Sequence, residues 1–90
     1  MKKFHYIGSL VKTRRKNHEK KLTQEDVAKA LGFGSHLISN IERERSSVSI
    51  RNIVPLCRVL GIDTDEMIEA MVKDYEHCLK NRVQKYMLTL

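Results

Sequence analysis

Apolar side chains recur along this chain every three or four residues, which is the period of α-helices rather than of strands. Phe4, Ile7, Leu10 and Val11 follow this spacing and predict a first helix over about residues 4–17. One proline and four glycines are too few for the many tight turns of a β-rich fold. The pattern therefore predicts an all-α protein.

Two further helices are predicted between residues 23 and 43. Thr23 and Asp26 have capping-box spacing, in which each side chain binds the other residue's backbone N–H. Two glycines at residues 32–34 then break the helix, and a third, short helix follows over about residues 35–43. The residues of both helices expected to face inward are Val27, Ala28, Leu31, Ile38 and Ile41.

A fourth helix is predicted to end at Gly61, but its start is ambiguous. Ser49 can cap it, whereas Pro55 is tolerated only in a first turn and kinks a helix interior. We therefore expect this helix to begin late, near Asn52, or to bend at its start.

The fifth helix is predicted to begin at a second capping-box pair, Asp63 and Glu66, and to carry a long apolar stripe. The stripe consists of Ile68, Val72, Tyr75, Leu79, Val83, Tyr86 and Leu90. It is longer than a four-helix body covers, so a second copy of the chain is the favoured partner. Folding back onto the domain, or fraying after Lys80, is the alternative.

We accordingly divide the chain into a domain, residues 1–72, and a C-terminal extension, residues 73–90. The residues predicted to make the dimer contact are Met71, Tyr75, Leu79, Val83 and Tyr86.

Composition narrows the possible functions. Ninety residues make one small domain with little interior for a cofactor or a deep cleft. The net charge of +6 favours polyanionic partners, and residues 1–21 alone carry +7, eight cations against one acid. No stretch approaches the ~20 apolar residues of a membrane span, and the basic N-terminus lacks the apolar run of a secretory signal.

Catalysis and metal binding are not predicted. The four histidines have no metal-ligand spacing with Cys57 or Cys78, and no glycine-rich phosphate loop is present. The two cysteines indicate reduced thiols in a cytoplasmic protein. We expect no catalytic, metal-binding or cofactor-binding residues.

Residues 24–41 have the order that a helix-turn-helix requires. Two helices that cross through a turn of about 3–4 residues touch where only a small side chain fits, and Ala28 meets that need. Gly32 supplies the tolerance of positive φ that the turn demands. The anchored second helix of such a pair turns its other face outward.

Residues 22–28 (LTQEDVA), 31–33 (LGF) and 38–43 (ISNIER) together resemble the XRE family of phage-repressor and Cro-like DNA-binding domains. The resemblance extends over about residues 7–72. It implies an all-α, five-helix, phage-repressor-like domain that binds double-stranded operator DNA, usually as a dimer, through a helix-turn-helix of its second and third helices.

In that family the third helix lies in the major groove. Carried over position by position, the resemblance assigns base contacts to Ser35, His36, Leu37, Ser39 and Asn40. Asparagine can bond an adenine edge twice, serine and histidine can bond base edges, and leucine can pack on a thymine methyl. The phosphate contacts that the resemblance implies are Thr23, Gln24, Arg14, Lys16, Lys21, Arg43 and Arg45.

The resemblance also implies that Arg15 pairs with Glu42 and fixes the angle of the third helix. Two positions depart from the family pattern. Gly34 stands where Ser or Thr often caps the third helix, so we expect Ser35 to take over the cap. Glu44 replaces a glycine that often follows this helix and disfavours a left-handed cap, so we expect the helix to extend or end differently.

These inferences describe a cytoplasmic, homodimeric, sequence-specific regulator of transcription with a palindromic operator. Repression by blocking polymerase is the default, and activation, as in controller proteins of restriction–modification systems, is the alternative. A protein-interaction module of the antitoxin or anti-repressor-partner type is the rival class, in which the long helix binds another protein. Removal of residues 75–90 separates the two, since only a homodimer becomes monomeric.

Overall fold

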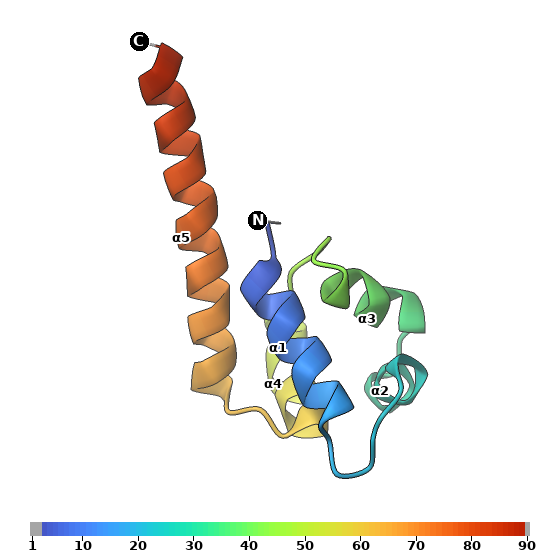
Figure 1. Ribbon diagram of the computed structural model, residues 1–90. Helices are drawn as coiled ribbons and strands as arrows, with labels where there is room; N and C mark the ends of the chain where they lie inside the picture. The colour runs from blue at the N-terminus through green and yellow to red at the C-terminus, as the bar shows by residue number, and fades with distance from the viewer. Residues whose placement is uncertain (1–2, 90) are drawn as a thin grey trace.

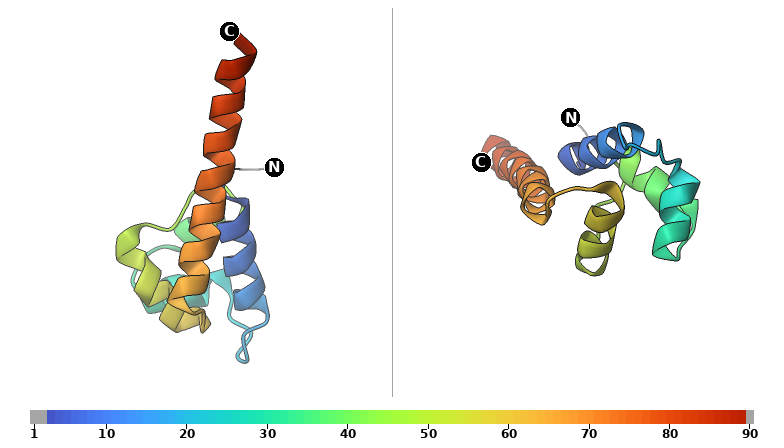
Figure 2. Two further views of the ribbon diagram at one scale, coloured as in Figure 1. Left: turned by 90° about the vertical axis from the view of Figure 1, so that its left-hand side faces the viewer. Right: turned by 90° about the horizontal axis from the view of Figure 1, so that it is seen from below.

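A computed structural model describes residues 3–89, which form five helices and no strand within that range (Figure 1). The helices are α1 (His5–Lys16), α2 (Gln24–Leu31), α3 (Ser35–Glu42), α4 (Ile50–Leu60) and α5 (Thr64–Thr89). The predicted all-α, five-helix fold is confirmed. The molecule measures 52 by 24 by 23 Å, because α5 projects beyond the body formed by the other helices (Figures 1 and 2).

The helix α1 occupies the middle of the body and contacts α3, α4 and α5. Ile7 and Val11 of α1 are completely buried. The other buried apolar residues are Val27, Ala28, Ile38, Ile41, Val48, Leu56, Cys57, Leu60, Ile62, Met67 and Ala70. In Figure 1, α2 and α3 lie on one side of α1 and α5 lies on the other. The core therefore holds α3 and α5 apart.

The helix α2 begins at the predicted capping box. The Asp26 N–H donates to Thr23 Oγ1 at 3.0 Å, and the Thr23 N–H donates to Asp26 Oδ2 at 2.9 Å. At its other end Gly32 has a φ of +78°, which lets the Phe33 N–H donate to the Ala28 carbonyl at 3.1 Å. The turn between α2 and α3 therefore forms around Gly32, as predicted.

The start of α3 differs from the prediction. Gly34 is the N-cap, with the extended φ of −72° and ψ of 150°, and Ser35 is the first helical residue. The Gly34 carbonyl accepts from the Leu37 N–H at 3.2 Å. The prediction that Ser35 would take over the cap is therefore wrong, because the carbonyl of glycine suffices to begin the helix without a side-chain bond.

The end of α3 also corrects the prediction. Glu44 adopts the left-handed conformation, with φ +65°, its N–H donates to the Ile41 carbonyl at 3.0 Å, and the Arg45 N–H donates to the Asn40 carbonyl at 2.9 Å. A non-glycine residue pays about 1–2 kcal/mol for this conformation. A side-chain hydrogen bond offsets part of the cost, since Glu44 Oε1 lies 2.7 Å from His5 Nδ1. The expectation that Glu44 would change how the helix ends is wrong.

The fourth helix begins earlier than predicted. Ser49 is the N-cap and α4 starts at Ile50, so a late start near Asn52 is wrong. Pro55 lies inside α4 on its exposed side. In a regular helix the N–H of residue 55 would donate to the carbonyl of Arg51, but proline has no N–H. Arg51 is exposed as well. Because the Arg51 carbonyl lies on the solvent side, water can take the place of the missing donor.

The second predicted capping box, between Asp63 and Glu66, does not form, and Asp63 instead caps α5 through Asp65. Asp63 Oδ1 accepts from the Asp65 N–H at 2.9 Å. The Glu66 carboxylate does not turn back to residue 63, because it binds Arg14 Nη2, at 2.6 Å for Oε2. Glu66 therefore attaches the start of α5 to α1.

A buried carboxylate holds the middle of α5 against α1. Asp74 is 5% exposed, and its Oδ1 and Oδ2 accept from the Tyr6 and Ile7 N–H groups at 2.8 and 2.9 Å. The first N–H groups of a helix have no partner within it, and the N-cap residue Phe4 supplies no side-chain bond. Asp74 therefore caps α1 from a different helix.

Candidate nucleic-acid interface

The side of α3 that faces away from the core is polar. Ser35 and His36 are exposed, and Ser39 and Asn40, one turn further along the same face, are half-buried. Leu37 instead packs partly against the core. The structure thus brings four of the five predicted base-contacting residues together on one face and places Leu37 beside it.

A buried ion pair joins α1 to the last turn of α3. Arg15 Nε lies 2.6 Å from Glu42 Oε2, and Arg15 Nη2 lies 2.8 Å from Glu42 Oε1. The two side chains are 12% and 3% exposed. Gln24 Nε2 donates to Glu42 Oε1 at 3.0 Å, and Arg15 Nη1 donates to the Leu22 carbonyl at 3.0 Å. One carboxylate thus ties α1, α2 and α3 together.

The pKa values of this pair reflect their contacts. Burial by itself raises the pKa of Glu42, because the carboxylate loses water. The hydrogen bonds from Arg15 and Gln24, with the positive charges of Arg15 and Lys12, outweigh burial and hold the pKa of Glu42 below its ordinary value. The hydrogen bond to Glu42 raises the pKa of Arg15. Both groups are therefore charged at neutral pH.

The predicted phosphate contacts at the start of α2 also have structural partners. The Thr23 hydroxyl accepts from the Asp26 N–H, and the Gln24 amide donates to Glu42. The backbone N–H groups of Gln24 and Glu25 belong to the first turn, where no carbonyl of the same helix can accept them. An anion at this helix start would thus be met by backbone donors.

The predicted phosphate-contacting cations lie in different places. Lys16 and Lys21 are exposed before α2, and Arg43 and Arg45 are exposed after α3. Arg14 instead binds Glu66 of α5, which lies on the other side of α1 from α3 (Figure 1). Four of these five cations therefore border the helix-turn-helix, and Arg14 does not.

Sequence reasoning missed a close approach of α1 to α3 at Gly8. A Cβ atom at this position would lie 2.6 Å from the Ile41 carbonyl oxygen and 2.8 Å from Glu44 Cγ. A glycine within an amphipathic helix is the signal that would have revealed this contact, because glycine there costs about 1 kcal/mol relative to alanine and so indicates a packing need.

Replacing Gly8 with alanine is expected to lower the free energy of unfolding by about 1–3 kcal/mol, because the backbone of α3 must move away from the new methyl group. Urea denaturation followed by circular dichroism measures the change. Gly34→Ala is the control, since a Cβ at Gly34 meets nothing within 4 Å and its φ is −72°, and we expect it to lose less than about 1 kcal/mol because alanine is a poorer N-cap than glycine. Equal stability of the two variants would contradict the close packing of α1 on α3.

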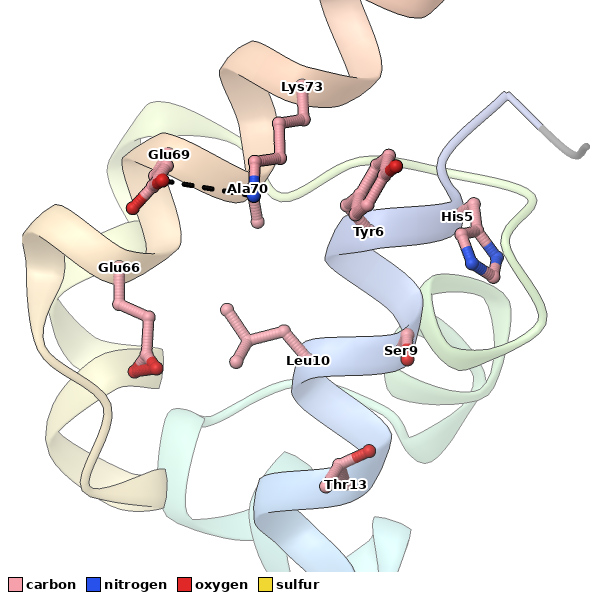
Figure 3. A pocket seen from close by; sticks show the side chains of 9 residues that line it. All are labelled: His5, Tyr6, Ser9, Leu10, Thr13, Glu66, Glu69, Ala70 and Lys73. Carbon is pink, nitrogen blue, oxygen red and sulfur yellow. Dashed lines mark ion pairs between the residues drawn. The ribbon is translucent and has the colours of Figure 1, made fainter.

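A hollow of about 500 Å³ lies between α1 and α5 (Figure 3). Its lining residues are His5, Tyr6, Ser9, Leu10, Thr13, Glu66, Glu69, Ala70 and Lys73. Leu10 points from α1 into this space, and Glu69 and Lys73 form an ion pair at 3.8 Å along its rim. Within residues 3–89 no group of three or more His, Cys, Asp or Glu side chains is arranged to hold a metal ion.

The described part of the chain also contains no helix with the length and hydropathy needed to cross a membrane. The features that distinguish the molecule are the polar face of α3 and the exposed length of α5.

Comparisons with known proteins agree with this geometry. No curated protein matches the chain. Among solved structures, the clp gene regulator ClgR from Corynebacterium glutamicum is similar in fold, with a TM-score of 0.64 and 22% identity over 97% of this chain and 92% of that chain. A family model described as helix-turn-helix matches residues 11–67, more than half of the sequence. The chain therefore belongs to the helix-turn-helix family of XRE type and is a DNA-binding regulator of transcription rather than an enzyme.

Proposed function

We propose that this protein is a homodimeric repressor that reads a palindromic operator with α3 in the major groove. The observation that carries the proposal is the polar, uncovered face of α3, anchored from behind by the buried Arg15–Glu42 pair. The major groove of B-form DNA is about 12 Å wide and admits one helix. A helix whose orientation is fixed before binding loses less entropy when it docks.

We assign the base contacts to Ser35, His36, Ser39 and Asn40. His36 and Asn40 are four residues apart and therefore neighbours on the helix surface, as are Ser35 and Ser39. Leu37 can reach a thymine methyl only with the part of its side chain that the core leaves uncovered.

The phosphate contacts in this proposal lie at both ends of the helix-turn-helix. The first-turn N–H groups of α2, next to Thr23 and Gln24, take one phosphate. The cations that border the helix-turn-helix, and that we assign to further phosphates, are Lys16, Lys21, Arg43 and Arg45. Each phosphate neutralised by a cation steepens the log–log salt dependence of binding by about 0.9. Arg14 is left out of this set, because it binds Glu66.

Two half-sites of an operator lie about 34 Å apart, one turn of DNA, and require two copies of α3. The exposed apolar residues of α5 support a dimer contact there. They equally favour a second candidate function, a protein-interaction module that binds another protein through α5. Size-exclusion chromatography separates the two, since a homodimer elutes at twice its chain mass without any added protein.

Selection of bound fragments from random duplex DNA tests the proposal. We expect enrichment of an inverted repeat, and we expect its affinity to fall steeply as salt rises. Failure to enrich any sequence, together with binding that does not respond to salt, would contradict the proposal.

Replacing Asn40 with alanine is expected to lower the free energy of discrimination between bases at one position of each half-site by about 1–3 kcal/mol, because a bidentate contact to adenine is lost. Non-specific affinity should not change, since the phosphate contacts remain. Fluorescence anisotropy with operator and scrambled duplexes measures both affinities. Asn81→Ala, an exposed asparagine of α5, is the control. Unchanged operator preference in Asn40→Ala would remove Asn40 from the interface.

A further inference from the structure

The helix α5 has two distinct faces. One face packs on the body through Met67, Ala70 and Asp74, which are buried. The opposite face carries exposed apolar residues from Ile68 (48% exposed) onward, and we call five of them the outer stripe: Val72 (54% exposed), Tyr75 (70%), Leu79 (46%), Val83 (50%) and Tyr86 (74%). The second half of α5 projects past the body, so this row extends beyond the reach of its own domain (Figures 1 and 2).

The spacing of the outer stripe is symmetric about its central residue. From Val72 to Tyr86 the steps are three, four, four and three residues, with Leu79 in the middle. A two-fold axis that is perpendicular to α5 and passes beside it at the level of Leu79 therefore relates this row to the same row of a second copy, residue by residue. A second copy related by this axis runs antiparallel and brings Leu79 against Leu79 of the second copy.

The same symmetry matches large side chains with small ones. Tyr75 lies opposite Val83 of the second copy, and Val72 lies opposite Tyr86 of the second copy. In a parallel pair Tyr75 and Tyr86 would each meet the same tyrosine of the second copy. Val72 and Val83 would each meet the same valine and leave a gap. Interfaces pack like protein interiors, where alternation of large and small residues fills space best.

The charges of α5 also favour the antiparallel direction. Residues 64–76 carry five acids and one lysine, net −4, whereas residues 77–89 carry three cations and no acid, net +3. Glu66 is already paired with Arg14 and Asp74 is buried against α1, and without these two acids the first half still carries a net charge of −2. Antiparallel pairing sets opposite charges beside each other, and parallel pairing sets like charges together.

We propose that the occupant of the outer stripe is a second copy of this chain, docked antiparallel with the two-fold axis at Leu79. This inference rests on the proposed function, which needs a dimer, and adds its direction and register. The paired rows span about 21 Å, 14 residues at 1.5 Å each. The projecting half of each α5 then lies along the first half of the other.

Disulfide cross-linking tests the arrangement in the full-length chain. The background for all variants is Cys78→Ser, and Cys57 is left in place because its side chain is only 3% exposed. Burial and the nearby carboxylates of Asp63 and Glu66 also raise the pKa of the Cys57 thiol, which disfavours the reactive thiolate. Three variants are made on this background: Tyr75→Cys, Val83→Cys, and the two together. Residues eight apart in one helix are about 12 Å apart and cannot be joined within a chain, because a disulfide needs Cα atoms within about 7 Å.

Under mild oxidation we expect the double variant to become mostly a covalent dimer on a non-reducing gel. Each single variant should stay mostly monomeric, as should Gln84→Cys, an exposed residue next to Val83 that lies off the stripe. Circular dichroism confirms that each variant keeps its helix content. Cross-linking of each single variant to itself would show a parallel pair and overturn the proposal.

A protein that elutes as a monomer and does not cross-link in any variant would also overturn it, because the stripe then has another occupant. DNA binding is measured separately on the Cys78→Ser protein. A cross-linked dimer without affinity for any duplex would contradict the proposed function and leave the antiparallel pair standing.

Discussion

Replacement of Arg15 with alanine is expected to lower the free energy of unfolding by about 3–5 kcal/mol, the cost of removing one partner from a buried ion pair. The loss is large because the Glu42 side chain, 3% exposed, stays charged and keeps only the Gln24 donor. Affinity for the operator should fall as well, because α3 loses its attachment to α1. Urea denaturation and fluorescence anisotropy, at a temperature where the variant is folded, measure the two effects.

Arg14→Ala is the matched control for this prediction. Arg14 is the adjacent arginine of α1, but its pair with Glu66 is 35% and 40% exposed, and such pairs contribute about 0–1 kcal/mol. Equal losses in the two variants would show that burial of the Arg15–Glu42 pair has no special effect on stability.

The same pair gives stability a defined response to acid. The pKa of Glu42 lies below its ordinary value of 4.5 in the folded protein, so its contribution is complete above about pH 4.5. The contribution is lost as the pH falls through the folded pKa. The stability difference between wild type and Glu42→Gln should therefore be constant near neutral pH and shrink below pH 4.5. A difference that stays constant down to pH 3 would contradict the lowered pKa.

Replacement of Asp74 with alanine is expected to lower the free energy of unfolding by about 3 kcal/mol, because the buried N–H of Ile7 and the part-buried N–H of Tyr6 lose a charged acceptor. The amides of Tyr6 and Ile7 should then exchange with solvent faster, since they are the groups that the carboxylate binds. Urea denaturation measures the loss, and hydrogen exchange followed by NMR locates it at these two amides.

Glu69→Ala is the control for Asp74→Ala, because this substitution removes a carboxylate from the exposed side of the same helix. Its pair with Lys73 is 3.8 Å long, and its side chain is 69% exposed, so we expect a change below about 1 kcal/mol. If the Tyr6 and Ile7 amides exchanged equally fast in wild type and Asp74→Ala, Asp74 would not act as the cap of α1.

Local chemistry was predicted well from the sequence. The Thr23–Asp26 box and the Gly32 turn depend on residues at most five apart, and their positions are read directly from spacing. The predicted late start of α4 near Asn52 was wrong, because the rule against proline in helix interiors does not say which side of the helix faces solvent. The start of α4 therefore needed the tertiary structure.

Contacts between distant residues were harder to predict. Asp74 and Tyr6 are 68 residues apart, and nothing in the spacing around Asp74 indicates that it caps another helix. The left-handed Glu44 is explained by His5, 39 residues away. The Arg15–Glu42 contact was inferred only because the sequence resembles a family in which that pair occurs. Such partners are set by packing, not by local propensity.

The first turn of α1 serves two neighbours at once. Its Tyr6 and Ile7 amides are held by Asp74 of α5, while its His5 and Gly8 contact the end of α3. A displacement of α5 is thus separated from the end of α3 by a single turn of α1. The first turn of α1 therefore connects the helix that carries the proposed dimer contact with the helix that carries the proposed base contacts.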